Sequence, residues 1–144
     1  MLQTNEKDYK KTESIALYCR VGSGTIQADA WAIEHQKKAL AQWAADRGFT
    51  PEQLVYLVDI GFSGCTLDRP GIRQFLSGDR KYTMLVAVNF SRFARDLSLV
   101  DALVDYADTQ GATIYALKEQ ISLNQWKHEQ DQLVYTLLKG GADK

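Results

Sequence analysis

Residues 15–20 read IALYCR, a short apolar run that stops at Arg20, and a Gly-Ser-Gly-Thr cluster follows at residues 22–25. A continuous apolar run of this length, bounded by turn-forming residues, is typical of a buried strand that leads into a loop. We therefore expect the first strand to place the guanidinium group of Arg20 at its carboxyl end.

The same alternation of apolar runs and helical segments continues along the chain. The pattern predicts helices at 27–47, 71–77, 98–109 and 125–138, and further strands at 54–58, 83–88 and 112–117. Strands that alternate with helices, each strand being continuously apolar, favour an α/β fold with a mostly parallel sheet of four to five strands and helices on both faces. We expect one domain over 14–138, a polar tail at 1–13 and a short tail at 139–144.

The amino-acid composition is that of a single globular domain. The chain has 144 residues, 45% of them hydrophobic, with 17 basic and 18 acidic side chains and a net charge of -1. This profile fits one ordinary globular domain. Cys19 and Cys65 lack the spacing of a metal site, so we expect two reduced thiols in a cytoplasmic protein that needs neither metal nor cofactor. The sequence has no segment of the length and hydropathy of a membrane span or signal peptide, so no membrane partner is expected.

The near-neutral total conceals a basic region. Residues 61–95 hold six basic and two acidic side chains, a net of +4, whereas the rest of the chain sums to -5. In parallel α/β folds the ligand site lies at the carboxyl ends of the strands, and the predicted loops there carry arginines. A guanidinium group suits phosphate because its planar fork donates two parallel hydrogen bonds. The alternative is that these arginines are solvated or paired with aspartates. They are Arg20, Arg69, Arg92 and Arg95.

Three motifs, taken together, resemble a known family. YCRV at 18–21, DIGFSG at 59–64 with LDRPG at 67–71, and FSRFARD at 90–96 are similar to the amino-terminal catalytic domain of serine site-specific recombinases, the resolvase/invertase and large serine integrase family. The similarity covers about residues 14–122. It implies a three-layer resolvase-like fold and cleavage of DNA by a serine that attacks a backbone phosphate and forms a phosphoserine link. It implies no metal or cofactor.

The resemblance assigns roles residue by residue. It places Arg20, Arg69, Arg92 and Arg95 among the catalytic and phosphate-binding residues, where fixed cations stabilise the charge of the transition state.

Two positions depart from the family pattern. Gly22 stands where the nucleophilic serine is expected, and Ser91 replaces an aspartate that precedes the first arginine of the third motif. We therefore expect a recombinase-like domain of a mobile element with impaired cleavage, acting as a DNA-associated or partner-binding accessory. Ser23 is an alternative nucleophile in an active enzyme, although a one-residue slip moves the hydroxyl by ~3.5 Å. A small-molecule anion-binding α/β domain is the third possibility.

The expected partners follow from the same resemblance. The chain stops before the DNA-binding domains that such recombinases append, as a natural stand-alone protein or as a truncated one, so we expect weak DNA binding by this domain alone. The domain is expected to form a homodimer or higher oligomer, or a hetero-oligomer with an active recombinase.

Overall fold

The computed structural model describes residues 13–22, 24–95 and 97–142, so residues 1–12 of the predicted tail and the candidate nucleophile Ser23 lie outside the described residues. The elements form one five-stranded sheet in the order β2-β1-β3-β4-β5. They are β1 (Ser14–Val21), α2 (Ile26–Asp46), the 3-10 helix η1 (Pro51–Gln53), β2 (Leu54–Ile60), α3 (Pro70–Leu76), β3 (Tyr82–Ala87), α4 (Phe90–Phe93), α5 (Leu97–Gln110), β4 (Thr113–Ala116), β5 (Ile121–Ser122) and α6 (Leu123–Ala142).

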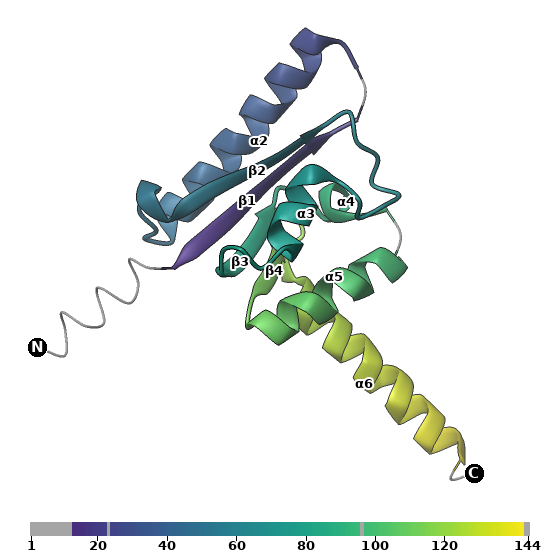
Figure 1. The fold of residues 1–144 in the computed structure, drawn as a ribbon. Coiled ribbons are helices and arrows are strands. Elements are labelled where there is room, and N and C mark those ends of the chain that lie inside the picture. Colours follow the sequence, from purple (N-terminus) through teal and green to yellow (C-terminus); the bar gives the residue numbers. More distant parts are fainter. Residues whose placement is uncertain (1–12, 23, 96, 143–144) are drawn as a thin grey trace, which may run out of the picture.

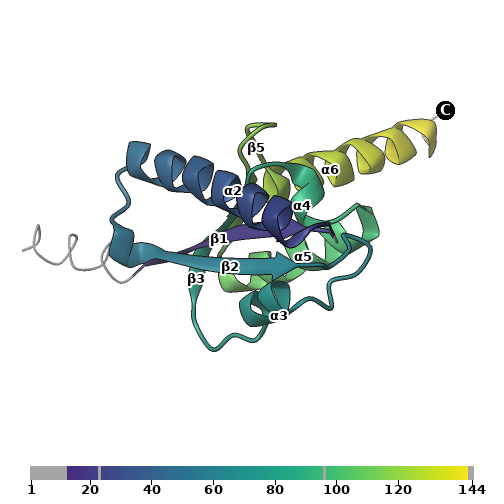
Figure 2. The ribbon, with the colours of Figure 1, turned by 90° about the horizontal axis from the view of Figure 1, so that it is seen from above.

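The sheet is mostly parallel and is covered by helices on both faces. β1 pairs in parallel with β2 and β3, β3 pairs in parallel with β4, and the short β5 runs antiparallel to β4. Helix α2 covers one face, while α3 and α5 lie on the other (Figures 1 and 2). The α/β prediction from the alternating pattern is thus confirmed, because each strand that is buried on both sides needs an apolar run.

The side chains of β1 alternate between the two faces of the sheet. Leu17 and Cys19 pack toward α2 in one core cluster, while Ala16 and Tyr18 belong to the second cluster, on the side of α3 and α5. Successive side chains of a strand point to opposite faces, so Arg20 shares the face of Tyr18. The first strand therefore delivers Arg20 to its carboxyl end on the face of α3, α4 and α5.

Three short elements were not predicted from the sequence. The 3-10 helix η1 before β2 has three residues, α4 in the polar stretch after β3 has four, and β5 in the turn after β4 has two. None of them is long enough to show a periodicity of 3.6 or 2 residues, and this periodicity is the signal on which such predictions depend.

The last helix is longer than the sequence predicted. Helix α6 runs from Leu123 to Ala142, so the range 125–138 was too short and the predicted tail from 139 is helical as far as 142. The side chain of Asn124 fixes its first turn: the Oδ1 atom accepts the amide of Ile114 at 2.7 Å, and Nδ2 donates to Asp108 at 2.7 Å. From this anchored base α6 extends away from the sheet (Figure 1).

The far half of α6 is apolar and exposed. Its large apolar side chains are more than half exposed to solvent, and they are Leu133, Val134, Tyr135, Leu137 and Leu138. None of the helices in the described part of the chain combines the length and hydropathy that a bilayer span requires.

Candidate functional site

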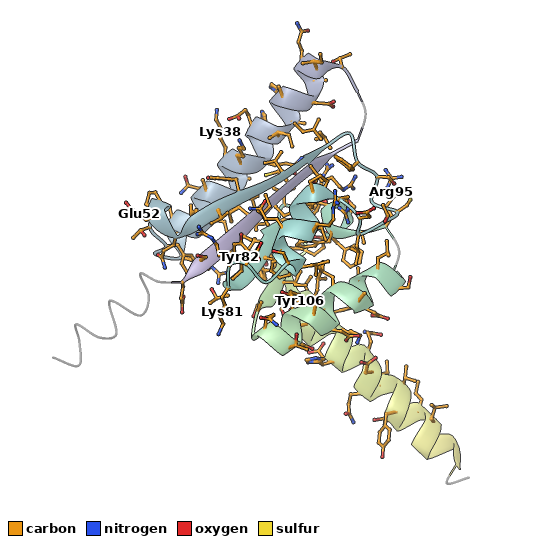
Figure 3. All side chains as sticks on the ribbon, viewed as in Figure 1. Lys38, Glu52, Lys81, Tyr82, Arg95 and Tyr106 are labelled. Atoms are coloured by element: carbon orange, nitrogen blue, oxygen red, sulfur yellow. The ribbon has the colours of Figure 1, made fainter. Side chains whose placement is uncertain are left out.

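The four predicted arginines come together at the carboxyl ends of β1 and β2. Arg20 belongs to the end of β1, Arg69 precedes α3, Arg92 lies in α4, and Arg95 follows α4. In Figure 3, Arg95 lies at the opposite end of the sheet from Glu52 and Lys81, which mark the starts of β2 and β3. Segments far apart in the sequence thus build one cationic cluster.

Arg20 is held by backbone carbonyls on two sides. Its Nε donates to the carbonyl of Arg92 at 3.0 Å, its Nη1 to that of Phe62 at 2.9 Å, and its Nη2 to that of Ser91 at 2.7 Å. The residue is only 3% exposed. These bonds fix the plane of the guanidinium group and tie β1 to the loop after β2 and to α4.

Helix α2 clamps the backbone of Arg20 from the other face of the sheet. The buried amide side chain of Gln36 accepts the N–H of Arg20 at 3.1 Å through Oε1 and donates to its carbonyl at 3.1 Å through Nε2. Gln36 was not among the site residues predicted from the sequence. A lone polar residue at helical spacing among apolar ones, beside Ile33 and Leu40, is the signal that could have indicated it.

Arg69 occupies a different position from the other arginines. It is 0% exposed, and its donors reach Thr66 O at 2.7 Å, Tyr18 Oη at 2.7 Å, Arg92 O at 3.1 Å and the carbonyl of Phe93. Its guanidinium group donates only to protein acceptors. These bonds connect the loop after β2 to α4. The predicted direct contact of Arg69 with a phosphate therefore has no open path in this arrangement.

A buried carboxylate completes this support. Asp59, 1% exposed, accepts the hydroxyl of Tyr18 at 2.7 Å and the amide of Gly71 at 2.7 Å. The hydroxyl of Tyr18 thus bridges Asp59 and Arg69. Burial, followed by the hydrogen bond to Asp59, raises the pKa of Tyr18 well above its ordinary value, so this hydroxyl keeps its proton.

Arg92 and Arg95 are the more accessible members of the cluster. Nη1 of Arg92 donates to the carbonyl of Arg20 at 2.9 Å, and its buried Nε has no hydrogen-bond partner among the residues that the structure describes. Arg95 has an exposed side chain, while its amide donates to the carbonyl of Gly64 at 3.0 Å. The loop after β2 is therefore bound to the segment after α4.

An open pocket of about 370 Å³ lies at this end of the sheet. The guanidinium groups of its wall are hydrogen-bond donors, and none of its lining residues in the described part of the chain is acidic. Its lining residues are Arg20, Gly22, Gly61, Phe62, Ser63 and Arg95.

The four arginines, Arg20, Arg69, Arg92 and Arg95, form no ion pair with a carboxylate among the described residues. Burial lowers the pKa of Arg20, and the charges of the other three guanidinium groups lower it further. Like charges that lie close together away from water raise the electrostatic free energy of the folded protein, and a bound anion lowers it. The arrangement is chemically suited to an anion with several oxygen acceptors.

The two departures from the family pattern lie at this cluster. Gly22 lines the pocket without a side chain. Ser91 is exposed, its hydroxyl donates to Asn89 Oδ1 at 2.8 Å, and its carbonyl accepts Arg20. Ser23, the alternative nucleophile, lies outside the described residues. Among the described side chains no group of three His, Cys, Asp or Glu residues is arranged to hold a metal ion.

Comparisons with known proteins agree with this architecture. The structure is similar to the N-terminal catalytic domain of TP901-1 integrase, with a TM-score of 0.68 and 17% identity over 91% of this chain and 97% of that chain. It is also similar to a resolvase family site-specific recombinase from Streptococcus pneumoniae, with a TM-score of 0.62 and 19% identity over 90% of this chain and 95% of that chain. No curated protein matches the sequence.

The family assignment comes from the sequence itself. A family model described as the resolvase N-terminal domain matches residues 15–143, which is nearly the whole chain. Together with the five-stranded sheet and the arginine cluster at its carboxyl end, this match confirms the resemblance that the three motifs indicated. The chain therefore belongs to the resolvase N-terminal domain family.

Proposed function

We propose that this domain takes part in site-specific recombination of a mobile element as a DNA-associated module with impaired strand cleavage. The observation that carries the proposal is the set of guanidinium groups beside an open pocket, none of which is paired with a carboxylate among the described residues. A DNA phosphate supplies the missing negative charge, and its non-bridging oxygens match the donor geometry of arginine.

The arginines divide into two groups in this proposal. Arg20 and Arg95 line the pocket, and the partly buried Arg92 donates to the backbone of Arg20, so these three are the phosphate-binding residues in this proposal. Arg69 is a positioning residue, because it donates to the carbonyls of Arg92 and Phe93 and thereby holds α4.

Impaired cleavage is inferred from Gly22. A phosphoryl transfer through a phosphoserine link needs a hydroxyl that reaches the phosphorus, and glycine supplies none. The loss of the aspartate at Ser91 removes a carboxylate that would orient the arginines. The alternative, an active enzyme that uses Ser23, predicts a covalent adduct with half-site DNA that disappears in Ser23→Ala; under our proposal the wild type forms no adduct.

The exposed apolar half of α6 is a candidate surface for assembly with another protein chain. The exposed apolar half of α6 extends away from the sheet (Figure 1), and apolar side chains at this density are normally covered. We propose that this helix pairs with a second copy of the chain or with an active recombinase. With a pocket for one phosphate and a net charge of -1, the domain alone binds DNA weakly.

The test is the salt dependence of DNA binding. We expect the affinity of the full chain for a short duplex, measured by fluorescence anisotropy, to fall steeply with salt, and we expect Arg95→Ala to reduce the slope of log K against log salt by about one. Arg80→Ala is the matched control, because this exposed arginine precedes β3 at the other end of the sheet. Binding that ignores both salt and Arg95 contradicts the proposal and favours a small-molecule anion.

A further inference from the structure

The turn after β4 carries a carboxylate that lies outside the three sequence motifs. We propose that Glu119 is a positioning residue for DNA binding: its side chain holds the first residue of α4, and α4 in turn supplies carbonyls that orient Arg20. This inference rests on the proposed function, since it concerns the arginines of the same site.

Helix α4 is too short to hold its own position. It has only four residues, and the bond from the amide of Arg92 to the carbonyl of Asn89 is long, at 3.3 Å. A single helical turn is unstable by itself, because it fixes several backbone torsions for few hydrogen bonds. The position of α4 therefore depends on its contacts with the rest of the fold.

The carboxyl end of α4 is held by the loop after β2. The buried Arg69 donates to the carbonyls of Arg92 and Phe93. The amide of Arg95 donates to the carbonyl of Gly64 at 3.0 Å. These bonds do not reach the first residue of the helix, so its amino end needs a support of its own.

The amino end of α4 is held by Glu119. Its Oε1 atom accepts the amide of Phe90 at 3.0 Å. Asn89, which precedes the helix, makes no such capping bond, and its Oδ1 atom instead accepts the hydroxyl of Ser91 at 2.8 Å. A hydrogen bond from an amide to a carboxylate is stronger than one to a neutral acceptor. Glu119 is thus the side chain that anchors the start of α4.

The turn that carries Glu119 is itself constrained. The amide of Lys118 donates to the carbonyl of Val88, after β3, at 2.9 Å. The amide of Gln120 donates to the carbonyl of Leu117 at 3.1 Å and closes the turn. Gln120 has a φ of 55°, in the left-handed region that residues other than glycine adopt only where the surrounding structure enforces it. The carboxylate of Glu119 therefore reaches α4 from a fixed support.

The bond to Phe90 acts on the arginines through the backbone of α4. The carbonyls of Ser91 and Arg92 accept Nη2 and Nε of Arg20 at 2.7 and 3.0 Å. A displaced α4 would remove both acceptors and leave Arg20 with the carbonyl of Phe62. Because Ser91 has no carboxylate, support of this kind comes to α4 from the turn after β4.

Two substitutions at position 119 separate positioning from charge. Glu119→Ala removes the acceptor and a negative charge, whereas Glu119→Gln removes the charge and keeps an acceptor oxygen. Loss of a negative charge favours the binding of a polyanion, so charge alone predicts tighter DNA binding by both variants. Positioning predicts weaker binding by Glu119→Ala.

The experiment measures binding of the full chain to a short DNA duplex by fluorescence anisotropy, and hydrogen exchange of the Phe90 amide by NMR. We expect Glu119→Ala to weaken binding by about fivefold and Glu119→Gln to stay within about twofold of the wild type. The Phe90 amide should exchange about fivefold faster in Glu119→Ala and at the wild-type rate in Glu119→Gln.

Glu52→Ala is the matched control for the loss of an acidic side chain. Glu52 is exposed and lies at the other end of the sheet from Arg95 (Figure 3). Its charge is screened from the arginines by salt, so Glu52→Ala should bind DNA within about twofold of the wild type.

The outcomes separate this inference from the proposed function. If Arg95→Ala lowers the salt slope but Glu119→Ala binds DNA as tightly as the wild type or more tightly, Glu119 does not position the arginines and only this inference fails. Equal losses of affinity in Glu119→Ala and Glu119→Gln overturn it as well, and so does an unchanged exchange rate of the Phe90 amide in Glu119→Ala. If the wild type shows no salt-dependent binding, the proposed function fails and the role of Glu119 in DNA binding fails with it.

Discussion

Arg20 and Arg92 hold each other reciprocally, each through the backbone of the other. Nε of Arg20 donates to the carbonyl of Arg92 at 3.0 Å, and Nη1 of Arg92 donates to the carbonyl of Arg20 at 2.9 Å. Two cations that repel each other are thereby locked side by side by neutral acceptors. The carboxyl end of β1 and helix α4 cannot move apart without breaking both bonds.

The buried hydrogen bonds of Arg20 are expected to contribute to the stability of the fold. Arg20→Gln removes the donors to three carbonyls and is expected to lower the free energy of unfolding by about 2–3 kcal/mol, because buried acceptors lose their partners. Urea unfolding measures the change. Arg95→Gln, on an exposed side chain, is the control and should change stability by less than about 0.5 kcal/mol. Equal midpoints for the two variants would show that the buried bonds of Arg20 add no net stability.

The bridge formed by Tyr18 predicts a dependence of stability on alkaline pH. The pKa of Tyr18 is raised in the folded protein, so the folded state keeps a proton that the unfolded chain releases. Stability from this group is fully present below the unfolded pKa of about 10 and is lost as the pH rises toward the folded pKa.

Tyr18→Phe isolates this contribution. The variant should be less stable at neutral pH by about 1–3 kcal/mol, because Asp59 loses the hydroxyl donor and keeps only the amide of Gly71. Its stability should also fall less steeply between pH 10 and 11 than that of the wild type, as measured by urea unfolding at each pH. If the free energy of unfolding falls equally with pH in the wild type and in Tyr18→Phe, Tyr18 is not the source of the loss of stability at alkaline pH.

Restoration of the two missing groups is expected to produce cleavage. A Cβ atom at Gly22 meets no atom of the described residues within 4 Å, so the first side-chain atom of a serine has room there. The double variant Gly22→Ser with Ser91→Asp should form a covalent adduct with half-site DNA when a DNA-binding partner is supplied, detected by a shift on a denaturing gel. Gly22→Ala with Ser91→Asp is the control without a hydroxyl. An adduct in that control would place the nucleophile elsewhere.

Glycine at position 64 is required by the close approach of two arginines. Gly64→Ala brings a methyl group to 3.1 Å from both Arg20 Nη2 and Arg95 Cγ, so these side chains must shift and DNA affinity should fall by about three- to tenfold. Gly22→Ala, which adds the same atom to open space at the same pocket, should leave affinity within about twofold. Similar affinities for the two variants would contradict this steric argument.

The two thiols should differ sharply in reactivity. Cys19 is buried, and burial raises the pKa of its thiol to about 12, whereas Cys65 is exposed in the loop after β2. Because the thiolate is the reactive form, an aromatic disulfide reagent should titrate one thiol of the folded protein and two in denaturant. Cys65→Ser should abolish the fast reaction; a persistent fast phase in that variant would mean that Cys19 opens to solvent.

The sequence predicted the elements whose signals are local. The apolar run that ends at Arg20 predicted β1, and the helical spacing of Ile33 and Leu40 predicted α2 almost to the residue. The four arginines could be assigned to one end of the sheet because the carboxyl ends of parallel strands meet there.

The burial of Arg69 could not be predicted in the same way. Besides the nearby carbonyl of Thr66, its acceptors are the hydroxyl of Tyr18 and carbonyls in α4, which are separated from it by between 23 and 51 positions along the chain. The clamp of Gln36 on Arg20 depends likewise on how α2 lies on the sheet. Such partners are set by tertiary packing, and sequence periodicity has no signal for them.

The separation of the four arginines along the sequence has a thermodynamic consequence. In an unfolded chain Arg20 and Arg69 are far from each other and from the neighbouring pair Arg92 and Arg95, and folding brings all four charges into mutual repulsion around one pocket. An anion that binds in the pocket as proposed would relieve that repulsion and would bind only the folded state. Folding and anion occupancy are therefore linked equilibria, in which each tenfold rise in anion concentration above the dissociation constant adds about 1.4 kcal/mol to stability. Under the proposed function, the cluster that binds a phosphate also makes the domain most stable when one is bound.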